Sequence, residues 1–315
     1  MGKRPAASGS QPAEPTSPPS LEVRVAWASC VWFVLVGLAL ALAGRTWAFA
    51  PWREAAADVL FGTPTFPAAL EPFAALTDVI IGGSIVGKWV AAAWLVAHPL
   101  RAGERWAHRA LVAGLVWWFA WDSGMSLAVG ATFNVWMINL LPFISFGALL
   151  AWAHRRGALD AARVMRPPHA PITASWRALT LVCWLFVAVG VALSLGSTSL
   201  LFGVYQRAVA EAWFEGALTV EALTWMRFSY GIIGATFGAH FLMLALALHG
   251  APGQRWVLTA VATSMLAWFV VDATGSALHG AWFNVWWVDA PSLVAVAIPW
   301  ALARRETRAR QSATP

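Results

Sequence analysis

Six polar or ionisable residues inside long apolar stretches of the chain are the ones we consider best placed to do chemistry in a membrane. They are Lys88, Asp122, Asn139, His240, Asp272 and Asp289. A charged side chain at the centre of a bilayer costs about 2.5 kcal/mol or more, so ionisable residues in spanning helices usually mark ion, proton or substrate sites. We therefore treat these six residues as candidates for an intramembrane polar site.

Two pairs stand out among the candidates: Asp122 with Asn139, and Asp272 with Asp289. Asp122 lies roughly 21 Å from the expected inner end of its helix at 1.5 Å per residue, which places the pairs in the outer half of the membrane. Two carboxylates in a low-dielectric site cannot readily both be charged, so Asp272 and Asp289 are expected to share a proton and titrate together. That behaviour suits proton coupling and favours the second pair as the active one.

Neighbouring residues extend the two clusters or neutralise them. Ser126 and Ser276 each follow an aspartate by four residues, which places them one turn further along on the same helix face. Lys88 and Arg227 are the basic residues expected within reach of the aspartates. Ion pairing that only holds helices together is therefore the structural alternative to a proton site.

Eight apolar stretches are available to position these side chains, and each is long enough to cross about 30 Å of hydrocarbon. They cover residues 25–46, 77–98, 108–130, 132–153, 176–197, 227–249, 255–278 and 282–303. Of the 315 residues, 59% are hydrophobic and 11% are charged, and the mean hydropathy is +0.64, which excludes a water-soluble globular enzyme. We expect an all-α integral membrane protein with eight transmembrane helices.

The distribution of Lys and Arg predicts how these helices are oriented. With the N-terminus inside, 16 of the 21 basic residues fall in inner segments, near residues 3–24, 101–109, 155–177, 255 and 304–310. Cytoplasmic loops are enriched in Lys and Arg, so both termini are expected in the cytoplasm, with the protein in a bacterial inner membrane. The net charge is +6, and the basic loops are expected to lie against anionic lipid of the bilayer. Nucleic acid is not expected as a partner.

An internal repeat relates the two halves of the chain. Residues Asp122, Ser126, Gly130, Ala131, Phe133, Asn134, Val135 and Trp136 recur 150 positions later as Asp272, Ser276, Gly280, Ala281, Phe283, Asn284, Val285 and Trp286. Gly83 and Gly87 recur as Gly234 and Gly238 at an offset of 151, and Cys30 and Gly37 recur as Cys183 and Gly190 at an offset of 153. Because each half has an even number of helices, the halves are expected to be parallel tandem four-helix repeats.

The repeat sets the expected boundaries of the chain's parts. They are a disordered cytoplasmic tail at 1–23, the first repeat at 24–154, a basic cytoplasmic linker at 155–175, the second repeat at 176–303 and a basic cytoplasmic tail at 304–315. The first tail is rich in Pro and Ser and has too little apolar surface to fold. Asn134 and Asn284, at the turn of each repeat, are expected to cap the helix that follows.

The two longest outer segments, residues 47–76 and 198–226, hold equivalent places in the two repeats. Their mixed sequences with aromatic residues favour a short helix in the headgroup region. Such helices would either close the outer ends of the bundles or gate a substrate site. The glycine pairs in the second helix of each repeat favour close helix approach.

The chain also holds 22 Trp residues, more than interfacial belts require. Several of them, including Trp118 and Trp268, lie within predicted spans on the same helices as the aspartates. Aromatic walls around a carboxylate suit a flat apolar ligand such as a quinone, an isoprenoid or a pigment, or a cation held by cation–π attraction. Ordinary packing and lipid contact explain the same pattern without a ligand.

No catalytic or cofactor-binding motif is present in the sequence. There is no H-E-x-x-H, G-x-S-x-G, phosphate-loop or dinucleotide pattern, and Cys30 and Cys183 are too few for a disulfide framework or a metal site. His240 is expected to be a packing histidine, too deep to ligate a haem together with His279. We therefore expect no cofactor and no metal, and activity as an enzyme is disfavoured.

These observations leave several functional hypotheses open. The leading one is a proton-linked small-molecule transporter with an outer-leaflet acidic site, whose partners besides the lipid bilayer are a proton and a small molecule. One alternative is a membrane-embedded binder or enzyme that acts on an apolar ligand such as a quinone, an isoprenoid or a lipid. The other is a structural or assembly subunit.

Overall fold

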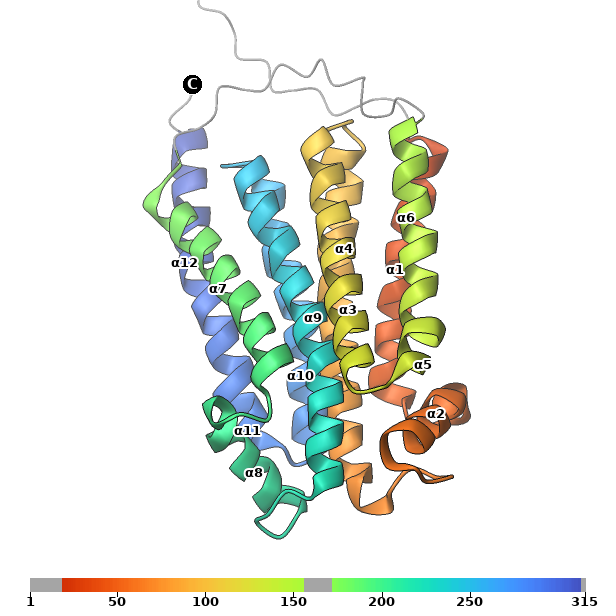
Figure 1. The fold of residues 1–315 in the computed structure, drawn as a ribbon. Helices are drawn as coiled ribbons and strands as arrows, with labels where there is room; N and C mark the ends of the chain where they lie inside the picture. Colours follow the sequence, from red (N-terminus) through yellow and green to blue (C-terminus); the bar gives the residue numbers. More distant parts are fainter. Residues whose placement is uncertain (1–18, 156–171, 313–315) are drawn as a thin grey trace, which may run out of the picture.

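The computed structural model describes residues 19–155 and 172–312, and all the regular structure in these two ranges is helical (Figure 1). The expected N-terminal tail up to residue 18, most of the basic linker and residues 313–315 lie outside the described residues. We call residues 19–155 the first half and residues 172–312 the second half.

Each half contains four long helices and, after the first of them, a shorter helix of 12 or 11 residues. In the first half they are α1 (Leu21–Ala43), the short α2 (Ala50–Phe61), α3 (Glu71–Leu95), α4 (Arg105–Ala128) and α6 (Leu140–Arg155). In the second half they are α7 (Ala174–Gly196), the short α8 (Gly203–Trp213), α9 (Val220–Gly250), α10 (Arg255–Leu278) and α12 (Ala290–Ser312). The predicted short helix is thus confirmed in both outer segments.

Before α6 and α12 the chain makes one α-helical turn and then one π-helical turn. These are α5 (Thr132–Asn134) with η4 (Val135–Asn139), and α11 (Trp282–Asn284) with η6 (Val285–Asp289). Short π-helical segments within helices often occur at functional sites, because the extra residue redirects side chains.

The helix boundaries follow local capping signals that the apolar pattern does not contain. α9 begins at Val220 rather than near residue 227, because the Thr219 hydroxyl accepts a hydrogen bond from the backbone N–H of Ala222 at 3.1 Å. α12 continues to Ser312, so the described part of the expected basic tail after residue 303 is helical.

Seven helical stretches are long and apolar enough to cross a membrane. They are Leu21–Ala43, Ala68–Leu100, Thr132–Arg155, Ala174–Gly196, Val220–Gly250, Arg255–Leu278 and Trp282–Arg310. α4 is as long as α10, at 24 residues, but it is not one of the seven. The seven helices support a multi-pass helical membrane protein.

α3 and α9 form the centre of the molecule. The most apolar stretch of α9 is 94% buried and that of α3 is 78% buried, against 22% for α1 and 28% for α7. α3 packs on α1 and on α10, whereas α9 packs on α7 and on α4, and α3 and α9 also pack on each other. The two halves therefore interlock, because each central helix packs extensively on a helix of the other half.

Close backbone approach holds α1 to α3 and α7 to α9. A Cβ atom added to Gly82 would lie 2.5 Å from the carbonyl oxygen of Gly37, and one added to Gly234 would lie 2.2 Å from that of Gly190. Glycine at these positions lets the helices touch through their backbones. In the first half this contact is made by Gly82, whereas Gly83 of the predicted glycine pair faces α10.

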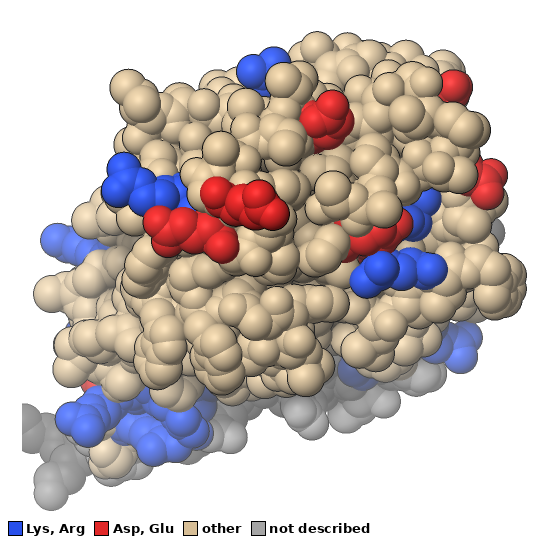
Figure 2. Space-filling view, turned by 90° about the horizontal axis from the view of Figure 1, so that it is seen from below, with Lys and Arg blue, Asp and Glu red and all other residues tan. Residues whose placement is uncertain are grey.

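α2 and α8 lie at the same end of the bundle, at the bottom of Figure 1, opposite the end that carries the C-terminus. Figure 2 shows this end from outside, with a few acidic and basic groups scattered over an otherwise uncharged surface. Exposed apolar side chains at the starts of these segments include Trp47 and Leu200. Such a surface is compatible with the headgroup region that the sequence predicts for both segments.

Candidate functional site

A tight turn after α4, and another after α10, returns the chain to the aspartate of the same helix. Gly130 and Gly280 adopt positive φ angles of 77° and 74°, which glycine tolerates without steric cost. After each glycine the backbone N–H of the next alanine donates to a serine carbonyl at 2.8 Å, and the chain re-enters a helix. The turn brings Asn134 back to Asp122, and Asn284 back to Asp272.

In the first half three side chains donate to Asp122. The amide nitrogens of Asn134 and Asn139 both lie 2.8 Å from its Oδ1 atom, and the Ser126 hydroxyl lies 3.4 Å from it. Asp122 is 1% exposed and Asn139 is fully buried. The structure therefore brings together the predicted pair, with the serine and the turn asparagine as additional donors.

In the second half the same arrangement differs from the first at one position. Asp272 accepts from the Asn284 amide at 3.0 Å and from the Ser276 hydroxyl at 3.2 Å, but Asp289 stands where the first half has Asn139. The Asn284 amide lies 3.4 Å from both carboxylate oxygens of Asp289. Asp272 and Asp289 are 1% and 0% exposed, and neither belongs to an ion pair in the described residues.

The two turn asparagines do not cap helices, which corrects the prediction from the sequence. Ala131 and Ala281 precede α5 and α11, and Asn134 and Asn284 precede η4 and η6, but none of these side chains makes a capping hydrogen bond. The Asn134 and Asn284 amides instead donate to the aspartate and, at 2.9 Å, to the serine of the preceding helix. Their role is to organise the polar clusters.

A side chain from the short helix of the same half, α2 or α8, completes each cluster. Trp52 on α2 donates its indole N–H to the Asn134 Oδ1 atom at 3.1 Å. Tyr205 on α8 donates its hydroxyl to the Asn284 Oδ1 atom at 3.1 Å and accepts from the Tyr230 hydroxyl at 2.6 Å. Burial raises the pKa of the Tyr205 phenol, which keeps the phenol neutral and able to donate.

A cavity of about 90 Å³ adjoins the cluster of the second half. Its polar lining comes from Asp272, Asn284, Tyr205, Tyr230, Ser84 and Ser292. The remaining lining is apolar, with aliphatic side chains and the aromatic rings of Phe202, Phe237 and Trp268. Ser84, on the central helix α3, is 1% exposed, and its hydroxyl has no hydrogen-bond partner in the described residues.

Lys88 forms no ion pair with Asp122 in the described part of the chain. Its ammonium lies 3.8 Å from the centre of the Trp118 ring and 4.9 Å from that of Trp89. Trp118 precedes Asp122 by one helical turn, so the ammonium lies against the indole next to the aspartate. Cation–π attraction of this kind contributes about 2 kcal/mol when both groups are desolvated.

The structure does not place the remaining two predicted site residues at the acidic clusters. Arg227 is exposed on α9 and belongs to no ion pair in the described residues. His240 is 1% exposed at the contact between α9 and α3, where a Cβ atom added to Gly87 would lie 3.0 Å from its ring. Neither ring nitrogen of His240 has a hydrogen-bond partner among the described residues.

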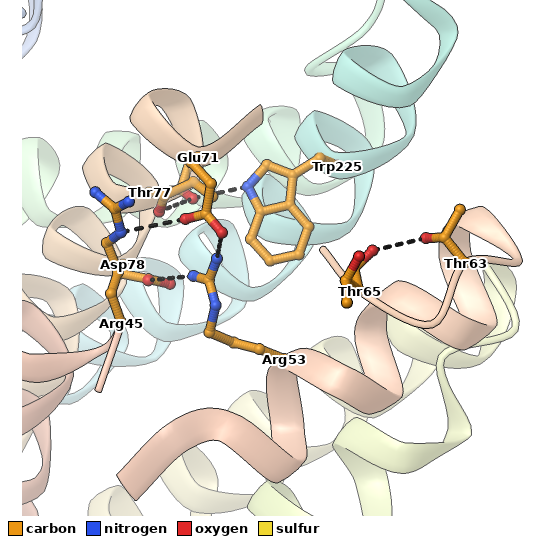
Figure 3. A network of polar contacts seen from close by, with 9 residues as sticks. Arg45, Arg53, Thr63, Thr65, Glu71, Thr77, Asp78 and Trp225 are labelled. Atoms are coloured by element: carbon orange, nitrogen blue, oxygen red, sulfur yellow. Dashed lines mark hydrogen bonds and ion pairs between the residues drawn. The ribbon is translucent and has the colours of Figure 1, made fainter. Parts of the chain in front are cut away.

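Sequence reasoning missed an ionic cluster between α2 and α3 (Figure 3). Arg53 on α2 contacts Glu71 at 2.7 Å and Asp78 at 3.5 Å, and Arg45 contacts Glu71 at 3.2 Å. Asp78 is 2% exposed although it lies within the predicted span 77–98, so its position in an apolar stretch was the available signal. The cluster fixes α2 against α3.

The tyrosines of the cavity and its unpaired serine were also missed. Trp52 and Tyr205 are 153 positions apart, the offset already seen between Cys30 and Cys183, but their residue types differ. Serine is common in packed helices, so nothing in the sequence distinguishes Ser84. Only the positions of the facing helices show that its hydroxyl lines a cavity.

Comparison of the chain with protein-family models, with curated proteins and with solved structures gives no match.

Proposed function

We propose that all eight long helices cross the membrane as two parallel tandem four-helix repeats, with both termini in the cytoplasm. α4 is included because it equals α10 in length and packs on the central helix α9 as α10 packs on α3. The matched hydrogen bonds of Asn134 and Asn284 support the repeat. The distribution of Lys and Arg supports the orientation and a bacterial inner membrane.

The function that the geometry supports best is proton-linked transport of a small, mostly apolar molecule by the second repeat. The observation that carries this proposal is the cavity of about 90 Å³ beside Asp272, next to two buried carboxyl groups without a basic partner in the described residues. Ligand sites are typically apolar cavities with a few convergent polar groups. Buried carboxyl groups near membrane cavities are typical of proton relays.

The first half indicates how the carboxyl pair holds its proton. The Asn139 amide donates to Asp122 there, and a protonated Asp289 has nearly the same shape and can donate to Asp272 in the same way. Two charged carboxylates around the Asn284 amide would repel each other in a medium of low dielectric constant. We therefore assign one shared proton to Asp272 and Asp289 when the cavity is empty.

α8 is the element through which the cavity would communicate with the outside. Its Tyr205 hydroxyl both lines the cavity and hydrogen-bonds Asn284, so movement of α8 would change the cavity and the acidic cluster together. The equivalent helix α2 has the additional ionic contacts of Arg53. This difference favours gating by α8 and a static cap at α2.

A second candidate function is binding of an apolar molecule without transport. The apolar and aromatic lining of the cavity favours it, because such a lining binds a flat hydrophobic molecule without any proton. The behaviour of the carboxyl pair separates the two functions.

Infrared difference spectroscopy between pH 5 and pH 8 tests the shared proton. The wild type should show a pH-dependent carboxyl C=O band that Asp289→Asn removes, whereas Asn139→Asp should add a second band. These variants are matched, because each gives one half the residue of the other half. Spectra of wild type and Asp289→Asn that are identical would overturn the proton-linked function.

Native mass spectrometry of the purified protein in a mild detergent tests the cavity. A small molecule that co-purifies with wild type and is lost from Ser84→Phe, in which the new ring fills the cavity, would support ligand binding. The same molecule retained by Ser84→Phe would show that it binds elsewhere and would contradict the assignment of the cavity.

A further inference from the structure

The acidic cluster of the first half has a built-in cation. The Lys88 ammonium lies 3.8 Å from the centre of the Trp118 ring. Trp118 lies on α4, one helical turn before Asp122. Lys88 is 4% exposed, so its charge is held inside the protein. Asp122 and Lys88 together bring no net charge into this part of the bundle.

Helix contacts identify the counterpart of Lys88 in the second half. Met125 on α4 and Gly275 on α10 are counterparts at the offset of 150. A Cβ atom added to Gly275 would contact Val79, and one added to Gly231 would contact Met125. Positions 79 and 231 are therefore equivalent. The Gly82 and Gly234 contacts match at the same offset of 152. The same offset pairs Lys88 with His240.

The second half therefore has no ammonium at this place. His240 has a shorter side chain, and neither of its ring nitrogens has a hydrogen-bond partner in the described residues. No cation–π contact to Trp268, the counterpart of Trp118, is present in the described residues. The second half also carries one additional carboxyl group, because Asp289 replaces Asn139.

The cavity lies beside this carboxyl pair, where a cation would meet a negative charge. Trp268 and Asp272 both line it, together with the rings of Phe202, Tyr205, Tyr230 and Phe237. Aromatic walls beside a carboxylate are the features that bind organic ammonium groups. The unpaired Ser84 hydroxyl, 1% exposed, lines the same cavity and offers a further acceptor for an N–H group.

We propose that the cavity of the second half binds a small organic cation, a protonated amine with a short apolar body, whose ammonium acts there as the Lys88 ammonium acts in the first half. The inference rests on the proposed function and names its substrate class. Asp272 pairs with the ammonium, the aromatic rings surround the apolar body, and Ser84 accepts a hydrogen bond.

Binding of the cation also explains the use of the shared proton. Entry of one cation next to Asp272 favours ionisation of the carboxyl pair, so the proton leaves as the cation arrives, and the total charge is unchanged. Besides Asp272, the titratable groups that line the cavity are Tyr205 from α8 and Tyr230 from α9. His240 and Lys88 follow lining residues, three positions after Phe237 on α9 and four positions after Ser84 on α3. An exchange of one cation for one proton is the transport cycle that follows.

The first experiment compares two probes of similar length by isothermal titration calorimetry on the purified full chain. n-Butylammonium reproduces the lysine side chain, and n-pentanol is its neutral counterpart. n-Butylammonium should bind at least about tenfold more tightly than n-pentanol, since hydrogen bonds to a charged group are stronger than those between neutral groups. In weakly buffered solution its binding should release about one proton.

Variants of single residues test whether n-butylammonium binds beside Asp272. Asp272→Asn should weaken binding of n-butylammonium at least about tenfold, whereas Asp58→Asn, at an exposed position of α2, should leave it unchanged. His240→Lys, which gives the second half the lysine of the first, should abolish binding because the cation is then supplied by the chain. Should a variant fail to fold, the comparison of the two probes on wild type still tests whether the protein prefers an organic cation to a neutral molecule.

The outcomes separate this inference from the proposed function. Equal binding of n-butylammonium and n-pentanol, with the infrared carboxyl band present, would overturn the cation and leave a proton-linked site for a neutral molecule. A second outcome would also overturn the organic cation. If n-butylammonium binding is lost in sodium chloride but kept in choline chloride of equal concentration, the site is one for an inorganic cation. Absence of both probe binding and the carboxyl band would overturn the proposed function itself.

Discussion

Asn134 and Asn284 lie 150 positions apart in the chain and make the same hydrogen bonds in two different places. Each donates to an aspartate and a serine of the preceding helix, and each accepts from an aromatic side chain of an outer short helix. What differs is the donor from the outer helix, Trp52 in one half and Tyr205 in the other. The asparagine thus connects the buried aspartate with the short helix α2 or α8 in both halves.

The first prediction concerns the connection made by Tyr205. Tyr205→Phe removes a donor to Asn284 and an acceptor for Tyr230, so two hydrogen bonds are lost, whereas Tyr230→Phe loses one. We expect Tyr205→Phe to lower the free energy of unfolding by about 2 kcal/mol and Tyr230→Phe by about 1 kcal/mol. Reversible unfolding in detergent measures both, and a larger effect of Tyr230→Phe would contradict the arrangement.

The second prediction concerns the carboxyl pair. Asn139→Asp places a second carboxyl group beside Asp122, and charging both groups in the folded state is unfavourable. This variant should therefore be less stable than wild type at pH 8 and should regain stability at pH 5, where the additional group is protonated. Thermal unfolding at the two pH values measures the change.

Asp289→Asn is the matched control for that prediction. It gives the second half the donor that the first half already has, so its stability should equal or exceed that of wild type at pH 8. Marked destabilisation by Asp289→Asn would mean that the Asp289 charge is needed for folding.

The third prediction concerns the contact between α7 and α9. A Cβ atom at Gly234 would lie 2.2 Å from the Gly190 carbonyl oxygen and 2.4 Å from the Ser194 hydroxyl, so the helices must separate in Gly234→Ala. We expect a loss of about 3 kcal/mol or more. Gly124→Ala, on an open face of α4 with no atom near the new methyl group, should instead gain up to about 1 kcal/mol.

The fourth prediction concerns the ionic cluster of α2 and α3. Arg53→Met leaves the buried Asp78 carboxylate without its basic partner and should cost about 3–5 kcal/mol, and adding Asp78→Asn should recover much of this. Arg45→Met should cost at most about 1 kcal/mol, because the Arg45 side chain is 52% exposed. Failure of the double variant to recover would show that Arg53 acts mainly through Glu71.

The fifth prediction concerns His240. Both of its ring nitrogens are buried without a hydrogen-bond partner in the described ranges, so His240→Leu should raise the free energy of unfolding by about 1–2 kcal/mol. The same variant should leave n-butylammonium binding intact, in contrast to His240→Lys. Destabilisation by His240→Leu would indicate that the imidazole has a polar partner in solution.

Much of the architecture could be predicted from the sequence by itself. Apolar stretches of about 20 residues have to be helical in a membrane, because the backbone then satisfies its own hydrogen bonds. The long helices could therefore be predicted to within a few residues, apart from the starts of α3 and α9 and the end of α12. The recurrence of Asp122, Ser126 and Asn134 as Asp272, Ser276 and Asn284 also indicated which residues belong together. Residues four apart on a helix, and residues joined by one tight turn, are local relationships.

The tertiary structure decided everything that depends on contacts between distant helices. No pattern predicted that α3 packs on α10, and α9 on α4, since two similar halves could equally have packed as separate bundles. That interlocking places Ser84 of the first half in the cavity of the second. It leaves Lys88 over Trp118, whereas the ring nitrogens of His240 have no hydrogen-bond partner among the residues that the structure describes. The physical reason is that a side chain's partners across a helix contact depend on helix rotation and register, and local hydropathy does not encode them.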